Sequence, residues 1–180
     1  MINQIRWERP IRGWVKVNMD GVASGPTNKA GCEGLIINDQ GNWLMGFSRN
    51  TGQANSFMAE TWALWDGLML CLQLNLQSVV IELDARALVD ALNSTTYANA
   101  VVSPLFDDCR QLVARFSRCC IRPIYHEANI CADKLSRLGL VQSLDFVLHH
   151  SPPVDLLPLI EANKHGLYSN RRCPAPYSVL

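Results

Sequence analysis

The first part of the chain contains three short, largely apolar segments that clusters of turn residues separate. Residues 14–20 alternate roughly between apolar and polar side chains, which is typical of a strand. Residues 21–31 are rich in Gly, Pro and Asn and predict a loop, and residues 38–42 predict a hairpin turn. Two further strands are predicted over residues 32–37 and 43–49. Together these segments indicate an antiparallel meander.

The spacing of apolar and small residues changes after residue 55. Ser56 can cap a helix over residues 57–74. Ala59, Ala63 and Gly67 recur every four residues within it, so they would form one narrow stripe along the helix. A stripe of such small side chains suits close packing of the helix on a sheet.

The second half of the chain alternates between predicted strands and helices. Residues 78–84 and 119–125 predict strands. Helices are predicted over residues 85–92, 104–117 and 128–138. Gly139 would end the last of them. The order β-β-β-α-β-α-α-β-α implies an α/β fold with a mixed five-stranded sheet, in which three antiparallel strands precede β-α-β crossovers and helices cover the faces.

Length and composition indicate one compact domain with short additions at its ends. The chain has 180 residues, of which 48% are hydrophobic and 18% are charged, and this balance excludes a disordered chain. We expect an irregular N-terminal leader over residues 1–13, the domain over residues 14–140 and a proline-containing tail over residues 141–180. The sequence is compatible with a whole protein and equally with part of a longer one.

Charge and cysteine content narrow the classes of function. Lys and Arg number 16, as do Asp and Glu, which excludes a strongly cationic nucleic-acid protein and leaves only a local site for a polyanion. The seven cysteines contain no C-x-x-C pair, so neither a zinc site nor a disulfide framework is indicated. We expect an intracellular, reducing compartment, either the nucleus or the cytoplasm. We also expect a monomer. No apolar run of about 18 residues exists, so the chain is not expected to enter a membrane.

Four acidic residues carry the chemical signal: Asp20, Glu60, Asp84 and Asp133. Taken alone, each has an ordinary interpretation as a turn residue, a helix cap or a solvated helix position. Taken together, at predicted strand ends and within helices, four converging carboxylates would repel one another strongly unless cations lay between them. Oxygen-rich sites of this kind select Mg²⁺, and a pair of ions about 4 Å apart can activate water against a phosphodiester.

Each acid lies in a short motif, and the motifs follow one another in a recognisable order. They occupy residues 18–21, 58–64, 81–84 and 127–135. In this order they resemble the ribonuclease H family, and in particular its plant reverse-transcriptase-like domains, many of which are related to retroelements. The resemblance spans residues 12–140 and implies the ribonuclease H-like fold.

The resemblance implies an endonuclease that hydrolyses the RNA strand of RNA–DNA hybrids with two divalent ions. These would be Mg²⁺, with Mn²⁺ as an alternative. Asp20 would bridge both ions, Glu60 and Asp84 would hold one of them, and Asp133 would hold the other. The partner would be an RNA–DNA hybrid or another nucleic acid.

The loop after the first predicted strand corresponds to a segment whose backbone contacts RNA in the family. Its residues include Gly25, Asn28, Lys29 and Gly31. Glycines there would permit close approach to a ligand, and the 2′-hydroxyl separates RNA from DNA at such a site. The alternative is a simple hairpin connection.

Two positions depart from the family pattern. The family usually has a histidine ten residues before its last aspartate, and this chain has Pro123 there. His126 either substitutes for that group or is merely exposed at a strand end, and we favour the second interpretation. Ala85 stands where relatives often carry serine, so one supporting hydrogen bond is in doubt.

Two other functions remain open at this point. One is a nucleic-acid-binding module that keeps the fold and has little or no turnover, which Pro123 and the neutral charge would explain. The other is a different two-metal nuclease on the same fold, such as an exonuclease or transposase domain.

Overall fold

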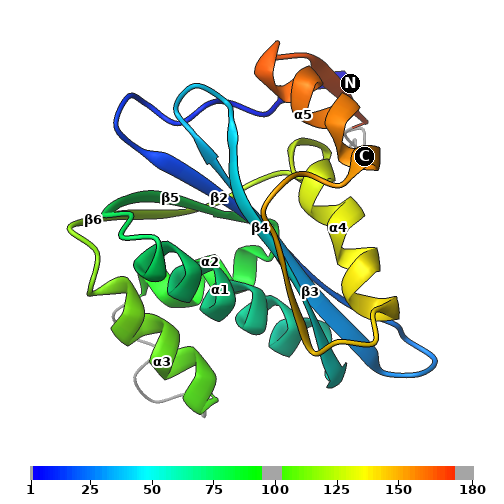
Figure 1. Ribbon diagram of the computed structural model, residues 1–180. Helices are drawn as coiled ribbons and strands as arrows, with labels where there is room; N and C mark the ends of the chain where they lie inside the picture. The colour runs from blue at the N-terminus through cyan, green and yellow to red at the C-terminus, as the bar shows by residue number, and fades with distance from the viewer. Residues whose placement is uncertain (1, 95–102, 173–180) are drawn as a thin grey trace, which may run out of the picture.

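The computed structural model describes residues 2–94 and 103–172 of the chain (Figure 1). The strands are β1 (Ile2–Arg6), β2 (Val15–Ala23), β3 (Lys29–Asn38), β4 (Trp43–Gln53), β5 (Ser78–Leu83), β6 (Arg118–Pro123), β7 (Phe146–His149) and β8 (Tyr168–Arg172). The helices are α1 (Ser56–Gln73), α2 (Arg86–Asn93), α3 (Pro104–Val113), α4 (Ile130–Val141) and α5 (Leu157–Lys164), with short 3₁₀ turns at His126–Ala128 and Val154–Leu156.

The main sheet has the order β6-β5-β2-β3-β4-β7. The β2, β3 and β4 strands pair antiparallel, whereas β5 and β6 run parallel to β2, so the predicted mixed sheet is confirmed. It has a sixth strand that the sequence did not predict: β7, from the predicted tail, pairs with the free edge of β4. This short strand is held by contacts distant in sequence, such as Phe146 stacked on Phe47 at 6.0 Å.

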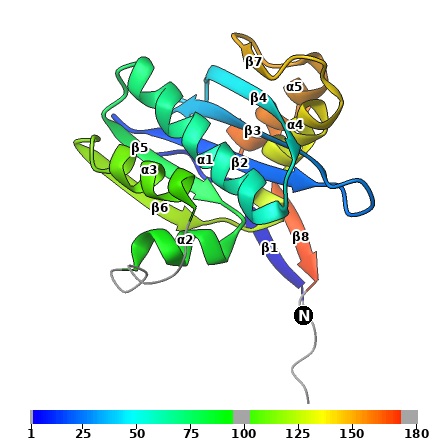
Figure 2. The same cartoon turned by 90° about the horizontal axis from the view of Figure 1, so that it is seen from below.

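Helices cover both faces of the sheet, as expected for this element order (Figure 2). On one face α1, α2 and α3 enclose the larger apolar core, which includes Met19, Leu64, Leu68, Ile81 and Phe106. On the other face α4 and α5 enclose a smaller core, which includes Trp7, Leu35, Ile37, Ala132 and Leu135.

The predicted small-residue stripe of α1 does face the sheet. A Cβ at Gly67 would collide with the sulfur of Met19, and a Cβ at Gly21 of β2 would collide with the backbone of Ala59 and Glu60. Small residues on both sides therefore let α1 approach β2 more closely than larger side chains would allow. This approach brings the first turns of α1 against the centre of the sheet.

Two helix signals in the sequence are corrected by the structure. The helix α1 begins at Ser56, and its cap is Asn55, whose side-chain oxygen accepts from the Met58 amide at 2.8 Å. Gly139 does not end α4, which continues to Val141. A Cβ at Gly139 would lie 2.7 Å from the Arg49 carbonyl oxygen of β4, so this glycine is required for close helix–sheet packing.

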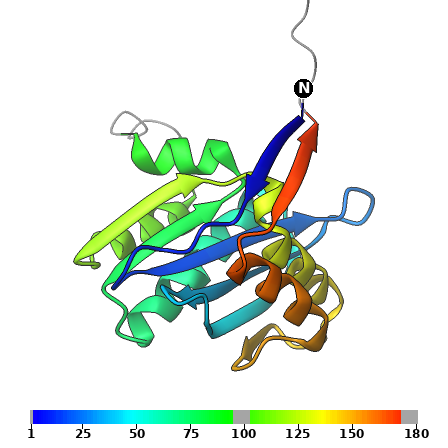
Figure 3. The same ribbon diagram turned by 90° about the horizontal axis from the view of Figure 1, so that it is seen from above.

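The two ends of the described chain lie side by side. The predicted irregular leader contains β1, which pairs antiparallel with β8 in a separate two-stranded sheet (Figure 3). Pairing between residues this far apart in sequence leaves no local pattern, so it was not predicted. Within the described part of the chain, no helix combines the length and the apolar character needed to span a membrane.

Candidate metal centre

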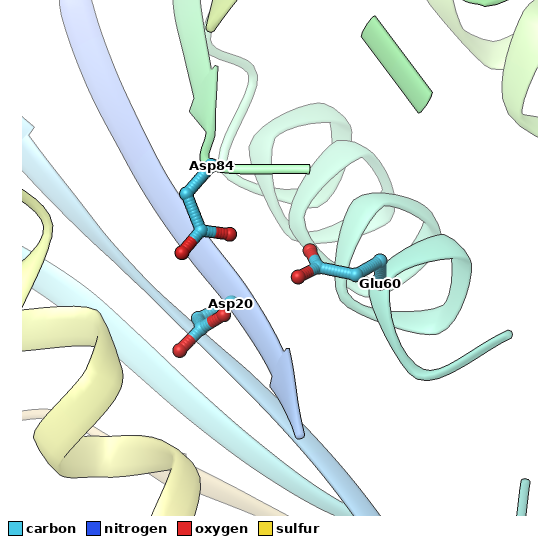
Figure 4. A group of neighbouring side chains, drawn as sticks. All are labelled: Asp20, Glu60 and Asp84. Carbon is cyan, nitrogen blue, oxygen red and sulfur yellow. The ribbon is translucent and has the colours of Figure 1, made fainter. Parts of the chain in front are cut away.

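Three of the four predicted acids converge at the middle of the sheet. Asp20 comes from β2, Glu60 from the N-terminal part of α1, and Asp84 directly follows β5 (Figure 4). One carboxylate oxygen of each lies within 4.8 Å of the corresponding oxygens of the other two. We call these three residues the carboxylate cluster.

Local structure explains why these side chains meet. The register of β2 and β5 aligns Met19 with Leu83, so the next residues, Asp20 and Asp84, are neighbours at the end of the parallel pair. The strand β2 extends to Ala23, so Asp20 lies within it and not at its end as predicted. Glu60 reaches the same place because Gly21 lets α1 approach β2.

Asp133 lies close to this cluster but is not one of the three. It is half-buried in the first turn of α4. The start of that helix is tied to β2, because the Asn129 side chain donates to the Met19 carbonyl oxygen at 2.9 Å. The negative charge of Asp133 acts on Asp20 and helps to raise its pKa. Convergence is therefore tight for three acids, and the fourth lies within electrostatic reach.

Burial and the repulsion between like charges raise the pKa of two members of the cluster, Asp20 and Glu60. Burial first, then the charges of Asp84 and Asp133, raise the pKa of Asp20 from 3.8 to about 7, although the Gly21 amide donates to its carboxylate at 3.0 Å. Burial first, then the charges of Asp20 and Asp84, raise the pKa of Glu60 to about 10. A divalent cation would replace the protons that hold this cluster together, since it neutralises the same charges.

The donor atoms present fit a divalent cation. The ligands offered are carboxylate oxygens, which are the atoms that Mg²⁺ prefers. One Glu60 oxygen and both Glu33 oxygens are buried and have no hydrogen-bond partner in the described part of the protein. Buried polar atoms without a partner call for an explanation, and a bound ion with its water molecules is one.

Glu33 is an acid that the sequence reasoning missed. It lies on β3 directly opposite Asp20 in register and is fully buried. The sequence did hold a signal, because Glu33 is the one charged residue in the predicted strand 32–37. Strand pairing alone shows which residue it faces.

The residues beside Asp84 form an open cavity of about 460 Å³. Its lining is Asp84, Arg86, Pro123, Ile124, Tyr125 and His126. The His126 side chain is 57% exposed, as the favoured interpretation expects, but its Nδ1 also lies 3.5 Å from an Asp84 oxygen. Ala85 is the N-cap residue of α2. Within the described part of the chain, no side chain makes a capping hydrogen bond at this end of the helix.

The predicted RNA-contacting loop is the hairpin between β2 and β3. Its turn is closed by the Asn28 amide, which donates to the Ser24 carbonyl oxygen at 2.8 Å, and Asn28 adopts a left-handed φ of 51°. Gly25, Asn28 and Lys29 are exposed. Gly31 is buried in β3 beneath α4 and serves packing. The nucleic-acid role of this loop stays a prediction.

Comparisons with known proteins agree with the fold. A family model described as reverse transcriptase-like matches residues 18–139. An Arabidopsis thaliana protein named "Putative ribonuclease H protein At1g65750" is 32% identical over 154 residues, which make up 86% of this chain and 24% of that protein. This chain thus spans less than two thirds of the length of that relative.

Two solved structures share the fold at lower identity. Ribonuclease H1 of the archaeon Halobacterium salinarum NRC-1 is 21% identical with a TM-score of 0.62, over 71% of this chain and 97% of that one. LC11 ribonuclease H1, isolated from compost and solved with an RNA/DNA hybrid, is 23% identical with a TM-score of 0.59, over 70% of this chain and 96% of that one.

Proposed function

The chain belongs to the reverse transcriptase-like family and has the ribonuclease H-like fold, and on this basis we propose that it hydrolyses the RNA strand of RNA–DNA hybrids. The observation that carries the proposal is the carboxylate cluster of Asp20, Glu60 and Asp84, with oxygens within 4.8 Å of one another. Such a cluster has little use in a merely structural role, because burial and like charges raise the pKa of Asp20 and of Glu60 and so destabilise the protein in the absence of a cation.

In the proposed enzyme, Asp20, Glu60, Asp84 and Asp133 hold two Mg²⁺ ions. When bound, such a pair of ions supplies an activated water and stabilises the leaving oxygen of a phosphodiester. Asp20 has the central position, since Asp84 after β5, Glu60 of α1 and Asp133 of α4 all act on its carboxyl. The closeness of the α1 backbone to β2 holds Glu60 in place, so the cluster is largely preformed.

The environment of Asp84 supplies the remaining groups of the proposed site. The favoured interpretation of His126 as merely exposed changes at this point: its ring lies 3.5 Å from Asp84 and lines the cavity beside it, so we assign it the auxiliary role that the family gives to a histidine. Arg86 lines the same cavity and offers a cation to a phosphate of the substrate.

A second candidate is a binding module that has the fold and lacks useful turnover. The presence of Pro123 in place of the family histidine favours it, because a positioned acid or base contributes about 10²–10⁴-fold to a rate. The balanced charge of the chain also gives no general attraction for nucleic acid.

Digestion of a hybrid with a labelled RNA strand separates these functions. We expect cleavage in Mg²⁺ by the wild-type protein and by Glu161→Gln, which alters an exposed acid of α5, and none by Asp20→Asn. DNA and RNA duplexes of the same sequence should stay intact. Equal, background-level cleavage by the wild-type and Asp20→Asn proteins would contradict the proposed enzymatic activity. Salt-sensitive hybrid binding without cleavage would favour the binding module. Cleavage of DNA alone would indicate a different nuclease.

A further inference from the structure

Glu33 lies at the centre of β3 with 0% of its surface exposed. The register of the sheet places it directly opposite Asp20 of β2 on one side and Ser48 of β4 on the other. Residues directly opposite each other in antiparallel strands point to the same face, with Cβ atoms about 4.5–5.5 Å apart. Glu33 therefore lies immediately beside the central acid of the carboxylate cluster.

The helix α4 covers this face and excludes water from Glu33. Leu35, two residues along β3 and on the same face, belongs to the core that contains Ala132 and Leu135 of α4. Two residues in the other direction, a Cβ at Gly31 would lie 2.8 Å from the backbone of Gly139. Glu33 thus lies beneath the helix that also carries Asp133.

Both carboxylate oxygens of Glu33 lack a hydrogen-bond partner in the described part of the protein. Another buried acid on the same sheet shows how such a group is normally satisfied. Glu82 is 3% exposed, and its oxygens contact the Lys16 ammonium at 2.8 Å, the Arg122 guanidinium at 2.7 Å and the Asn18 amide at 3.0 Å. Among the described residues, no cation and no donor bonds to Glu33, and the Ser48 hydroxyl opposite it donates to the Gln142 side-chain oxygen at 2.6 Å instead.

The charges that act on Glu33 are negative. Glu33 is fully buried, and the four predicted site acids act on it, Asp20 foremost. A buried acid with four acidic neighbours and no donor is costly to fold, whichever protonation state it adopts. A cation held by Asp20 would supply the missing positive charge, and its water molecules would supply the missing donors.

We propose that Glu33 is a fifth carboxylate of the metal centre, which acts on the cation through its retained water and strengthens its binding. This inference rests on the proposed function, since it takes the carboxylate cluster to be a cation site. Among the described residues, the group with oxygens within 4.8 Å comprises Asp20, Glu60 and Asp84, so Glu33 acts behind the direct ligands as a positioning residue. Groups that hold direct ligands or metal-bound water in this way commonly govern affinity.

The affinity of the metal centre can be measured directly, without a substrate, by titration with Mn²⁺. Binding is monitored by the loss of the electron paramagnetic resonance signal of the free ion. We expect Glu33→Gln to bind Mn²⁺ about 10- to 100-fold more weakly than the wild-type protein. Glu33→Asp keeps the carboxylate and should recover part of the affinity. Glu161→Gln should bind as the wild-type protein does, and Asp20→Asn should lose most of the binding.

Thermal unfolding in EDTA shows whether the variants are folded. Glu33→Gln should be at least as stable as the wild-type protein there, because the amide carries no charge and can donate to Asp20. Wild-type affinity in a folded Glu33→Gln protein would overturn the role of Glu33 and leave the proposed function intact. Failure of the wild-type protein to bind Mn²⁺ at millimolar concentration would overturn both. Equal weakening in Glu33→Gln and Glu33→Asp would show that shape and not charge matters, and would also overturn the inference.

Discussion

Replacing Asp20 with asparagine should stabilise the cation-free protein at alkaline pH. The folded structure raises the pKa of Asp20 from 3.8 to about 7 because the carboxyl is buried and faces Asp84 and Asp133. The folded protein therefore keeps a proton that the unfolded chain releases, so stability falls as the pH rises from about 4 to about 7 and stays low above that. Asparagine cannot ionise, and its oxygen can still accept from the Gly21 amide.

The pKa shift sets the size of the effect. A shift of about three pH units corresponds to at most about 4 kcal/mol, at about 1.4 kcal/mol per unit. In a chain of this length, 1 kcal/mol moves the melting temperature by about 2–4 °C, so Asp20→Asn should melt up to about 8–16 °C above the wild-type protein at pH 8. At pH 4 the two proteins should melt at nearly the same temperature.

Circular dichroism melts between pH 4 and pH 8 in EDTA, repeated in Mg²⁺, provide the assay. Mg²⁺ at 100 times its dissociation constant should stabilise the wild-type protein by about 2.7 kcal/mol and the variant by much less. The gap seen in EDTA should therefore shrink. Glu161→Gln, whose carboxyl is 58% exposed, serves as the control and should show no gap. A variant that is less stable than the wild-type protein at pH 8 in EDTA, or a gap independent of pH, would refute the electrostatic argument.

Three further outcomes test other parts of the structure. Lys16→Met removes a buried cation 2.8 Å from Glu82 and should cost about 3 kcal/mol in urea unfolding, whereas an unchanged midpoint would show that the pair is dispensable. Gly21→Ala forces α1 away from β2 and should lower stability by about 1–3 kcal/mol and weaken Mn²⁺ binding, so full binding would contradict the need for close approach. His126→Ala should lower the rate of hybrid cleavage by about 10²-fold without changing hybrid affinity, and an unaltered rate would assign the histidine to the surface.

The candidate site could be predicted in large part because its signals are local. Asp20, Glu60 and Asp84 lie in short motifs whose strands and helix show clear periodicity. The parallel pairing of β2 and β5 follows from the β-α-β order, and it brings Asp20 and Asp84 to the same edge. The glycine and alanine stripe of α1 likewise predicts close packing on the sheet, and this packing brings Glu60 next to Asp20 and Asp84.

Other features depend on contacts between distant parts of the chain. Gly139 reads as a helix stop in sequence, but α4 passes through it because Arg49 of β4 leaves no room for a side chain there. The β7 strand is only four residues long, which is too short for a clear periodic pattern. The β1 strand depends on pairing with β8, far along the chain, and such a pairing leaves no local signal in the sequence.

By itself, the sequence determined the order of the elements from β2 to α4, the mixed sheet and the acids that could bind a cation, because side-chain periodicity and motif order are properties of neighbouring residues. Tertiary structure decided that Asp133 lies beside the cluster and not within it, and that Glu33 of β3 lies directly opposite Asp20 of the neighbouring strand β2. Strand register and helix docking bring those groups together through pairings whose partners are far apart in sequence, and burial by α4 then turns an ordinary glutamate into an unsatisfied one.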